Sequence, residues 1–452
     1  MRFLMAIFPL LLVTQLATAD RLAIATFKAD VTPPLGTPLC SGAIMPAAEI
    51  LAPLTARGIV LFPETQKPVV LCAVDWIGIA NEGQDRWREA LANAAGTTPD
   101  RVAVHALHPH DTPVCDFSTD AVLTEYGLGG TTFNVDFAVA AIKHTAAAVK
   151  ASIAEKQPVS AIAAGSGEVQ EVASNRRILG NDGRVAHVRW TATTDAAVRA
   201  FPVGTIDPKV QLVSFWNGDT PVAVLTYYAT HPQSFYGKGQ VSPDFVGMAR
   251  EAREAALPGV LHVHFNGAGG NIGAGKWNDG APENRPVLAA KLEAGMKLAW
   301  DTQKKEPLTE ASLDWKSLPI TLPAREEIDE AREQTVLKDP AAKPGERTAA
   351  ATELVFRQRN AAGKGIPLSR LRINGVDILH MPGELFVEYQ LMAQQMAPGR
   401  HVCMAAYGDY SPGYIGTEIA YAEGGYETEL HVSRTSAAVE TVLRNALEDL
   451  LK

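Results

Sequence analysis

The chain alternates short apolar segments with longer segments of helical pattern along nearly its whole length. The apolar segments are rich in β-branched and aromatic residues, as buried strands are. Such alternation predicts an α/β fold in which mixed β-sheets are flanked by helices. The predicted strands are residues 58–62, 69–74, 102–107, 210–216, 223–228, 260–265 and 376–381, and the predicted helices are residues 82–95, 135–155, 243–256, 286–302 and 436–451.

The pattern continues without a break that would separate two domains. No linker rich in Pro, Gly or Ser divides the chain, and no internal repeat is present, so we expect one domain over residues 20–452. Residues 323–365 depart from the pattern because they are highly charged and rich in alanine. Asp339-Pro340 and Lys343-Pro344-Gly345 divide this segment into two predicted helices, which we expect to form an insertion.

The N-terminal segment has the pattern of a signal peptide. Arg2 precedes an apolar run, and Ala17-Thr18-Ala19 places small residues before Asp20. We therefore expect cleavage near Ala19 and a secreted or periplasmic protein. The apolar run is too short to span a bilayer, and no later segment is long and apolar enough, so the sequence predicts no transmembrane anchor.

Charge and cysteine content argue against a protein that binds nucleic acid or anionic membranes and against a fold built on disulfide bonds. The chain has 41 Lys and Arg residues against 50 Asp and Glu, an excess of negative charge that makes nucleic acid and anionic membranes poor partners. Its four cysteines are too few and too far apart for a disulfide framework. One or two bridges remain open, the sequence does not pair them, and it does not set the oligomeric state. The cysteines are Cys40, Cys72, Cys115 and Cys403.

Two His-x-His pairs are candidate metal or catalytic sites. If residues 101–110 continue as a strand, the period of two places His108 and His110 on one face, near the end that Pro109 produces. His262 and His264 form a second pair. Spacing alone does not choose between the pairs, and structural histidines are the alternative for both.

Two further candidates lie where predicted strands end. His231 follows the strand that ends at residue 228 and precedes a helix start at Ser242-Pro243-Asp244. Glu384 follows a strand that stops at Pro382-Gly383, and we expect it to open a helix, where a carboxylate is favoured electrostatically. Taken alone, each residue also has a purely structural explanation.

Two glycine-rich segments have the composition of pocket loops. Residues 266–275 contain glycines that allow backbone N–H groups to approach an anionic oxygen, although a tight turn explains the same residues. A second segment near the C-terminus combines glycines with tyrosines, which is typical of a lined pocket. Its tyrosines are Tyr410, Tyr414, Tyr421 and Tyr426.

In their order along the chain, these segments resemble the catalytic domain of neutral/alkaline non-lysosomal ceramidases. The first anchor, residues 107–113, resembles that family's Thr-His-Thr-His-Ser-Gly-Pro. The second anchor, Asn175-Arg176, is similar to the family's Asn-Arg-Ser, and the third is His231-Pro232-x-Ser234 with residues 241–247. The fourth, Met381-Pro382-Gly383-Glu384, resembles Pro-Gly-Glu-Phe. The fifth is Tyr414 with Tyr426, which keep the separation of two family tyrosines.

The resemblance implies a zinc ion held by four residues, and it favours the first His-x-His pair over the second. Two imidazoles, a carboxylate and a phenolate are suitable zinc ligands, and a catalytic site keeps a position for water. The implied ligands are His108, His231, Glu384 and Tyr414.

The resemblance also implies the reaction, which is hydrolysis of an amide (N-acyl) or ester bond by a water molecule that zinc activates. His110 would then accept the proton of the water and return it to the leaving group. Arg176 and Tyr426 would line the pocket, and the glycine segment would face the oxyanion through Gly269, Gly270 and Asn271.

The chain departs from the family pattern in three places. The family has a catalytic serine in Gly-Asp-Val-Ser-Pro-Asn, whereas residues 270–275 here contain none, and Lys276 is a candidate for the missing polar group. We expect no counterpart of the immunoglobulin-like domain that follows in full-length ceramidases, and the insertion at residues 323–365 matches no ceramidase segment. The substrate is therefore left open between a lipid, ceramide among them, and an acylated sugar.

Three alternatives accompany the prediction of a hydrolase. The first is a deacetylase that acts on acylated carbohydrate. In the second, a protein of the same fold binds metal and ligand without catalysis, which the missing serine favours. In the third, a structural surface module carries the histidines incidentally.

Overall fold

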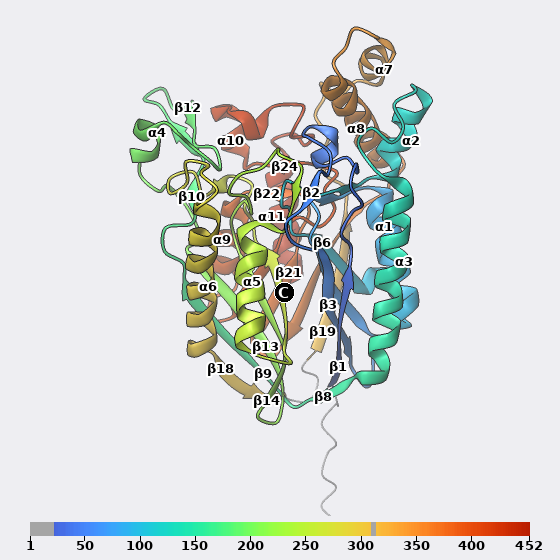
Figure 1. Cartoon of the computed structure of the whole chain (residues 1–452). Helices are drawn as coiled ribbons and strands as arrows, with labels where there is room; N and C mark the ends of the chain where they lie inside the picture. The colour runs from blue at the N-terminus through green and yellow to red at the C-terminus, as the bar shows by residue number, and fades with distance from the viewer. Residues whose placement is uncertain (1–21, 309–312) are drawn as a thin grey trace, which may run out of the picture.

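Most of the apolar segments form strands of three larger sheets in the computed structural model, which describes residues 22–308 and 313–452 (Figure 1). The first sheet has the order β6-β4-β3-β1-β8, the second β16-β14-β13-β9-β18 and the third β19-β20-β21-β23. The expected α/β architecture of mixed sheets with flanking helices is thereby confirmed. The predicted signal peptide lies outside the described residues and stays a prediction.

The strands of the three large sheets are short and largely buried. The first sheet contains β1 (Leu22–Asp30), β3 (Thr55–Phe62), β4 (Val69–Val74), β6 (Val102–Ala106) and β8 (Gln157–Val159). The second contains β9 (Ala161–Glu168), β13 (Lys209–Asn217), β14 (Thr220–Tyr228), β16 (Leu261–Asn266) and β18 (Lys304–Pro307). The third contains β19 (Leu313–Ile320), β20 (Ile366–Ile373), β21 (Val376–His380) and β23 (His401–Ala405).

One face of each large sheet contributes to a shared central core, which contains Leu71, Phe215, Leu225 and Ile378. Helices cover the other faces. The pairs are α1 (Glu82–Ala95) and α3 (Val135–Ser152) on the first sheet, α5 (Asp244–Ala256) and α6 (Asn284–Thr302) on the second, and α9 (Val387–Met396) and α11 (Val439–Leu451) on the third. A strand that is covered on both faces has apolar side chains on both, so its sequence is a continuous apolar run, and the strands could be predicted for this reason.

Smaller elements surround the upper end of the sheets in Figure 1. The short strands are β2 (Glu49–Ile50), β5 (Gly78–Ile79), β7 (Val114–Cys115), β10 (Ser174–Asn175), β11 (Arg177–Leu179), β12 (Val185–Val188), β15 (Gln240–Val241), β17 (Ile272–Gly273), β22 (Glu384–Leu385) and β24 (Tyr414–Ile415). Short helices here are α2 (Phe117–Glu125), α4 (Ala196–Ala200) and α10 (Glu418–Glu423). The 3₁₀ turns of the described residues are η1 (Cys40–Gly42), η2 (Pro99–Arg101), η3 (Ile153–Glu155) and η4 (Tyr426–Thr428).

The charged segment at residues 323–365 contains α7 (Glu330–Lys338) and α8 (Pro344–Ala361), which project at the top of Figure 1. The two helices pack against α2 through Leu337, Leu354 and Leu123. Arg325, at the base of the segment, donates a 2.6 Å hydrogen bond to the carbonyl of Thr428. The segment is therefore joined to the η4 turn, which follows the tyrosine-rich loop.

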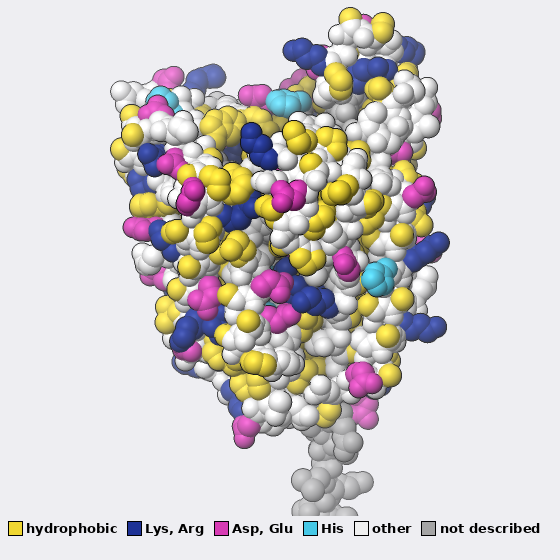
Figure 2. Space-filling view, in the orientation of Figure 1, with side chains coloured by type: hydrophobic (Ala, Val, Ile, Leu, Met, Phe, Trp, Pro, Cys, Tyr) yellow, Lys and Arg dark blue, Asp and Glu magenta, His cyan; other side chains and the backbone are white. Residues whose placement is uncertain are grey.

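The surface in Figure 2 intersperses basic and acidic side chains, and basic residues gather on the projecting helices. One helical stretch, Val135–Glu155, is long and apolar enough to cross a bilayer by composition. Its α3 portion instead packs its buried residues against the first sheet. All four cysteines are free of disulfide bonds within the described part of the chain.

Each large sheet contains one pair of parallel neighbours. These pairs are β4 with β6, β14 with β16, and β21 with β23. Backbone bonds join their C-terminal ends across sheets, since Ala106 N donates to Tyr407 O and Ala406 N donates to Asn266 O, both at 2.9 Å. The loops that follow these strands therefore meet at one place.

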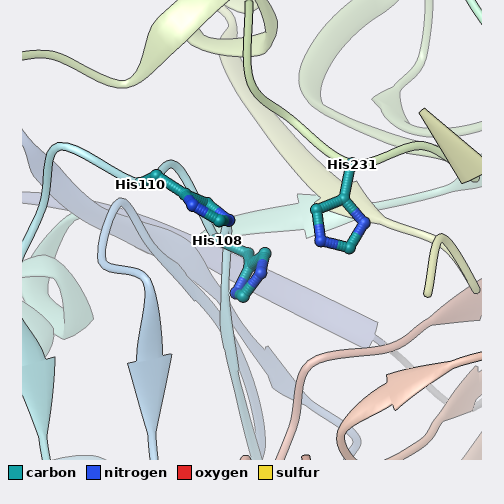
Figure 3. Close-up of side chains that lie close together, drawn as sticks. All are labelled: His108, His110 and His231. Atoms are coloured by element: carbon teal, nitrogen blue, oxygen red, sulfur yellow. The ribbon is translucent and has the colours of Figure 1, made fainter. Parts of the chain in front are cut away.

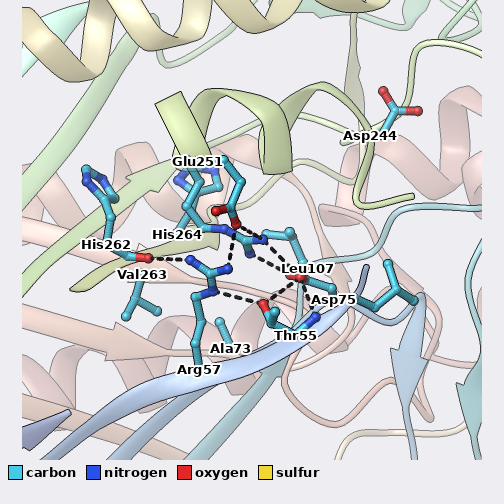
Figure 4. Close-up of polar contacts among 12 residues, drawn as sticks. Thr55, Arg57, Ala73, Asp75, Leu107, Asp244, Glu251, His262, Val263 and His264 are labelled. Carbon is cyan, nitrogen blue, oxygen red and sulfur yellow. Dashed lines mark hydrogen bonds and ion pairs between the residues drawn. The ribbon is translucent and has the colours of Figure 1, made fainter. Parts of the chain in front are cut away.

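A buried polar network joins the first sheet to α5 (Figure 4). Asp75 accepts hydrogen bonds from Arg250 at 2.6 and 2.9 Å, and from the Thr55 hydroxyl at 2.8 Å. Arg57 extends the network to Glu251 and to the carbonyl of His262. The side chains of Asp75, Arg57 and Arg250 are fully buried, so each charge depends on its partners in the network.

Removing one charge from this network should destabilise the fold strongly. We expect Arg250→Met to lower the free energy of unfolding by ~3–5 kcal/mol, because it leaves the Asp75 carboxylate buried without its main partner. Urea unfolding followed by circular dichroism measures the change. Lys28→Met removes a cation that pairs with Glu254 at the surface and should cost at most about 1 kcal/mol. Equal losses in the two variants would contradict the assigned role.

Candidate metal centre

The candidate metal centre lies where the parallel strand pairs end. His108 follows β6, His231 follows β14, and Glu384 follows β21 within the short strand β22. Tyr414 lies opposite Glu384, because β22 and β24 pair in parallel with these two residues as partners. Glu384 was expected to open a helix, which is wrong, since α9 begins only at Val387.

Two imidazoles meet at one oxygen of Glu384, and the Tyr414 phenol contacts one of these imidazoles. Oε2 of Glu384 lies 3.4 Å from Nε2 of His108 and 3.1 Å from Nε2 of His231. The phenol oxygen of Tyr414 lies 3.3 Å from the same His231 nitrogen. Segments far apart in the sequence thus bring two nitrogen and two oxygen donors together.

Backbone carbonyls orient both imidazoles. Nδ1 of His108 lies 2.5 Å from the carbonyl oxygen of Ile77, and Nδ1 of His231 lies 2.8 Å from that of Gly269. Because a carbonyl only accepts, each Nδ1 carries the proton and each Nε2 keeps its lone pair. This is the arrangement in which metal-ligating histidines are held.

His110 contributes a third imidazole (Figure 3). Nitrogen atoms of His108, His110 and His231 all lie within 4.8 Å of one another, so these three residues form a group that could hold a metal ion. Both ring nitrogens of His110 are buried and have no hydrogen-bond partner among the described residues. A half-exposed ring, that of Tyr236, stands 4.7 Å from the His110 ring.

The prediction that His108 and His110 share one face of a strand is wrong. Strand β6 ends at Ala106, and His108 has a left-handed φ of 65°. Alternation along a strand therefore does not bring His108 and His110 together. The turn does so instead, while His108 N donates a 2.9 Å bond to Trp76 O. A left-handed backbone is costly for a residue other than glycine, and such strain is commonly found at functional sites.

Burial and the neighbouring groups set the charges of the centre. Burial alone would raise the pKa of Glu384, but its contacts with His108 and His231 hold that pKa well below its usual range. Burial lowers the pKa of His231 and of His110. The centre therefore presents the neutral imidazoles of His110 and His231 and the ionised carboxylate of Glu384, which are the states that bind a metal.

Arg176 and Tyr426 lie beside the centre. Nη1 of Arg176 donates to the phenol oxygen of Tyr414 at 3.1 Å, and the Arg176 side chain is only 3% exposed. The Tyr426 ring lies 5.8 Å from the Tyr414 ring and 5.1 Å from the Trp190 ring, in edge-to-face geometry. These contacts line one wall of the site with a cation and aromatic rings.

The glycine segment has a different role from the one expected. Gly270 N donates to Leu385 O at 2.9 Å, so this N–H is not available to an oxyanion. Asn271 is also committed, because its side chain accepts from Val387 N at 2.9 Å and donates to Glu388 at 2.8 Å. Gly269 supplies the carbonyl that orients His231. A side chain at Gly269 would lie 2.7 Å from the Thr230 backbone, so glycine is required there.

Two other sequence candidates are placed away from these contacts. The Lys276 ammonium donates to the carbonyls of Arg199 and Phe201 at 2.9 and 2.6 Å, at the C-terminal end of α4. It therefore neutralises a helix end and does not replace the missing serine in this geometry. His262 and His264 both contact Thr226, inside the second sheet.

Sequence reasoning missed Tyr407 and Glu427, and it gave Tyr410 no role beyond lining a pocket. The Tyr410 hydroxyl donates a 2.8 Å hydrogen bond to Oε1 of Glu384, and the Tyr407 ring stacks on the His108 ring at 4.6 Å. Glu427 lies 3.3 Å from Arg176. The tyrosine-rich composition pointed to the region of Tyr410. Glu427 carried no signal beyond following Tyr426, because its partners are remote in sequence.

The residues present fit a zinc ion. Nε2 of His108 and Oε2 of Glu384 are buried and have no hydrogen-bond partner within the described ranges, so both are free to coordinate. Nitrogen and carboxylate donors are those that zinc prefers. Two donor sets are available, one with Glu384 and Tyr414 beside His108 and His231, and one made of three imidazoles.

Comparisons with known proteins agree with this fold. No protein-family model matches the sequence, and no curated protein matches it. The chain is similar in structure to the neutral ceramidase from Pseudomonas aeruginosa, with a TM-score of 0.68, 17% identity and coverage of 96% of this chain and 74% of that one. A ceramidase complexed with C2 is equally similar, with 75% of its chain covered. The chain therefore has the neutral ceramidase fold.

Metal content tests the centre directly. After zinc supplementation and dialysis, we expect about one zinc ion per chain, held by the neutral imidazoles and the carboxylate. Both His231→Ala and Glu384→Ala should lose it, as measured by elemental analysis. His264→Ala is the matched control, because it removes a buried histidine of the same sheet that lies outside the cluster. Zinc retained by His231→Ala, or absent from the wild type, would refute the centre.

Proposed function

We propose that the protein is a zinc-dependent hydrolase of amide or ester bonds. The observation that carries the proposal is a group of three neighbouring imidazoles with an ionised carboxylate against two of them. Nε2 of His108 and Oε2 of Glu384 have no hydrogen-bond partner among the described residues. The structural neighbours with this fold are ceramidases, which supports an acyl bond as the target.

In this proposal His108, His231, Glu384 and Tyr414 hold the zinc ion. A bound zinc ion lowers the pKa of a water molecule and polarises a carbonyl oxygen. Tyr410 keeps one oxygen of Glu384 occupied, which leaves Oε2 as the coordinating atom. The carbonyls of Ile77 and Gly269 fix the imidazole rings, so that little reorganisation is needed when the metal binds.

His110 is the proposed general base and acid. Its ring lies 5.1 Å from the His108 ring, and both of its nitrogens are free of hydrogen bonds among the described residues. Burial lowers the pKa of His110, so the imidazole is neutral and ready to accept a proton from water. The same imidazole then gives the proton to the leaving amine or alcohol.

Arg176 and Tyr426 are proposed to line the part of the pocket that holds the substrate. The Arg176 guanidinium is buried beside the Tyr414 oxygen, where a permanent positive charge stabilises the oxyanion that develops from the carbonyl. Because Gly270 and Asn271 have committed their donors elsewhere, this charge carries more of the oxyanion stabilisation than the glycine segment does.

The proposed substrate class is an N-acyl or O-acyl lipid or an acylated sugar. Ceramide is one member, and a deacetylase of acylated carbohydrate is another form of the same chemistry. The signal-peptide pattern that ends at Ala17-Thr18-Ala19 supports a secreted or periplasmic location for this activity. The excess of acidic residues favours small-molecule substrates over nucleic acid.

A second candidate function is binding without catalysis. The committed donors of Gly270 and Asn271 favour it, because an oxyanion hole that lacks donors would hold a ligand without accelerating its hydrolysis. A screen of zinc-loaded protein across ceramides, acylated sugars and simple acetyl esters separates the two. Binding of a ligand without turnover of any of them would favour the second function.

Replacing His110 separates its role as a base from a role as a ligand. We expect His110→Gln to retain zinc while kcat/KM falls by about 10²–10⁴, the usual contribution of a positioned acid–base group. Rates on the best substrate of the screen, together with metal content, measure both. His187→Gln, which changes an exposed histidine, should behave as wild type. Loss of zinc with activity would instead assign His110 to a three-imidazole metal site.

A further inference from the structure

Glu427 occupies a completely buried position beside the candidate metal centre. It lies in the η4 turn, and its side chain has no exposed surface. Its Oε1 lies 3.3 Å from Nε of Arg176, and its Oε2 lies 3.3 Å from Nη1 of Arg177. One carboxylate thus lies between two consecutive arginines, with one oxygen directed to each.

The two arginines have different surroundings. Arg177 also contacts Glu423 at 3.1 Å and donates to the carbonyl of Ala420 at 3.0 Å, so it anchors α10. Arg176 points the other way, toward the Tyr414 oxygen at 3.1 Å and the Gly270 carbonyl at 3.5 Å. The Nε–H of Arg176 forms no aligned hydrogen bond within the described residues, so its contact with Glu427 is a charge pair.

The contacts form a continuous path from Glu427 to the metal-ligating atoms. Glu427 contacts Arg176, Arg176 contacts the Tyr414 oxygen, and this oxygen lies 3.3 Å from Nε2 of His231. Every side chain on the path is buried. Solvent therefore screens the charges along this path only weakly, and the electrostatic interactions between them are strong.

Charge balance explains why a carboxylate is needed there. Glu423 and Glu427 together offset Arg177 and Arg176, which leaves the Glu384 carboxylate without a compensating cation in this cluster. Without Glu427, the positive charge of Arg176 would be offset by Glu384 and the Tyr414 oxygen. Those are the atoms proposed to bind zinc, and an uncompensated guanidinium would repel the cation.

We propose that Glu427 is a positioning residue of the metal centre, which holds and neutralises Arg176 so that Glu384 and Tyr414 stay available to the metal. The proposal rests on the function proposed above. Its rival is a purely structural ion pair that holds the η4 turn in place. The rival predicts a loss of stability, whereas the positioning role predicts a loss of zinc affinity that depends on Arg176.

The first test compares two carboxylates of the same cluster. We expect Glu427→Gln to weaken zinc binding roughly 10–100-fold, the range typical of residues that support metal ligands. Chelator competition measures the dissociation constant. Glu423→Gln is the matched control, since it contacts Arg177 and not Arg176, and should stay within about threefold. Glu427→Asp keeps the charge and should recover much of the affinity. Equal affinities in Glu427→Gln and Glu423→Gln would overturn the proposal.

A double-mutant cycle separates positioning from folding. In an Arg176→Met background no guanidinium needs to be neutralised, so Glu427→Gln should change the zinc dissociation constant by no more than about threefold. Thermal unfolding of each metal-free variant identifies any that fails to fold. A loss of the same size in both backgrounds would assign Glu427 to the structural role and overturn the proposal.

A wild type that binds no zinc would refute the proposed function without deciding the role of Glu427. Crystal structures of metal-free wild type and Glu427→Gln then decide it. We expect Arg176 Nη1 to stay 3.1 Å from the Tyr414 oxygen in the wild type, and the guanidinium to turn toward the Glu384 carboxylate in the variant. An unchanged position of the Arg176 side chain in Glu427→Gln would overturn the proposal.

Discussion

A carboxylate buried among three imidazoles is the constraint around which this end of the molecule is organised. An ionised group without partners is very costly away from water, so Glu384 must be surrounded by groups that favour its charge. The protein supplies the Tyr410 hydroxyl, which donates to one oxygen, while Nε2 of His108 and of His231 lie against the other. The Nδ1 protons of both imidazoles are held by backbone carbonyls, so in the neutral rings the Nε2 lone pairs face this oxygen without donating to it. Such an arrangement is poorly satisfied by protein atoms alone, and a divalent cation would complete it.

The three sheets make this convergence possible because each contributes one pair of parallel strands. The C-terminal ends of those pairs meet, and the loops that follow them carry the candidate ligands. Rigidity behind the site comes from the buried network in which Arg250 holds Asp75. Asp75 directly precedes Trp76 and Ile77, whose carbonyls accept from the backbone and the ring of His108. The network therefore supports both the packing of the first sheet and the orientation of an imidazole.

The glycine segment shows how similar sequence can be put to a different use. Its glycines permit close approach, but the atoms that approach are those of Thr230, Glu384 and Leu385. The segment consequently shapes the metal centre from behind and presents few donors to a substrate. In the proposed function Arg176 is the charged group that faces the substrate, and its charge pair with Glu427 would allow a guanidinium to lie close to a bound cation.

The sequence by itself determined the elements and much of the list of candidate residues. Helices α1, α3, α5, α6 and α11 lie where helical segments were predicted, because the pattern of apolar residues along a helix is a local property. His231 and Glu384 were found because strand ends are marked by Pro, Gly and polar residues in the sequence, and the family resemblance added Tyr414 and Arg176. Only the tertiary structure decided which imidazoles face one another, which carbonyls orient them, and that Glu427 stands behind Arg176. Those contacts join residues separated by tens to hundreds of positions, and no local pattern records them. The sequence did not show that the N–H of Gly270 is taken by Leu385 for the same reason, since whether an N–H is free depends on a strand that arrives from elsewhere in the chain.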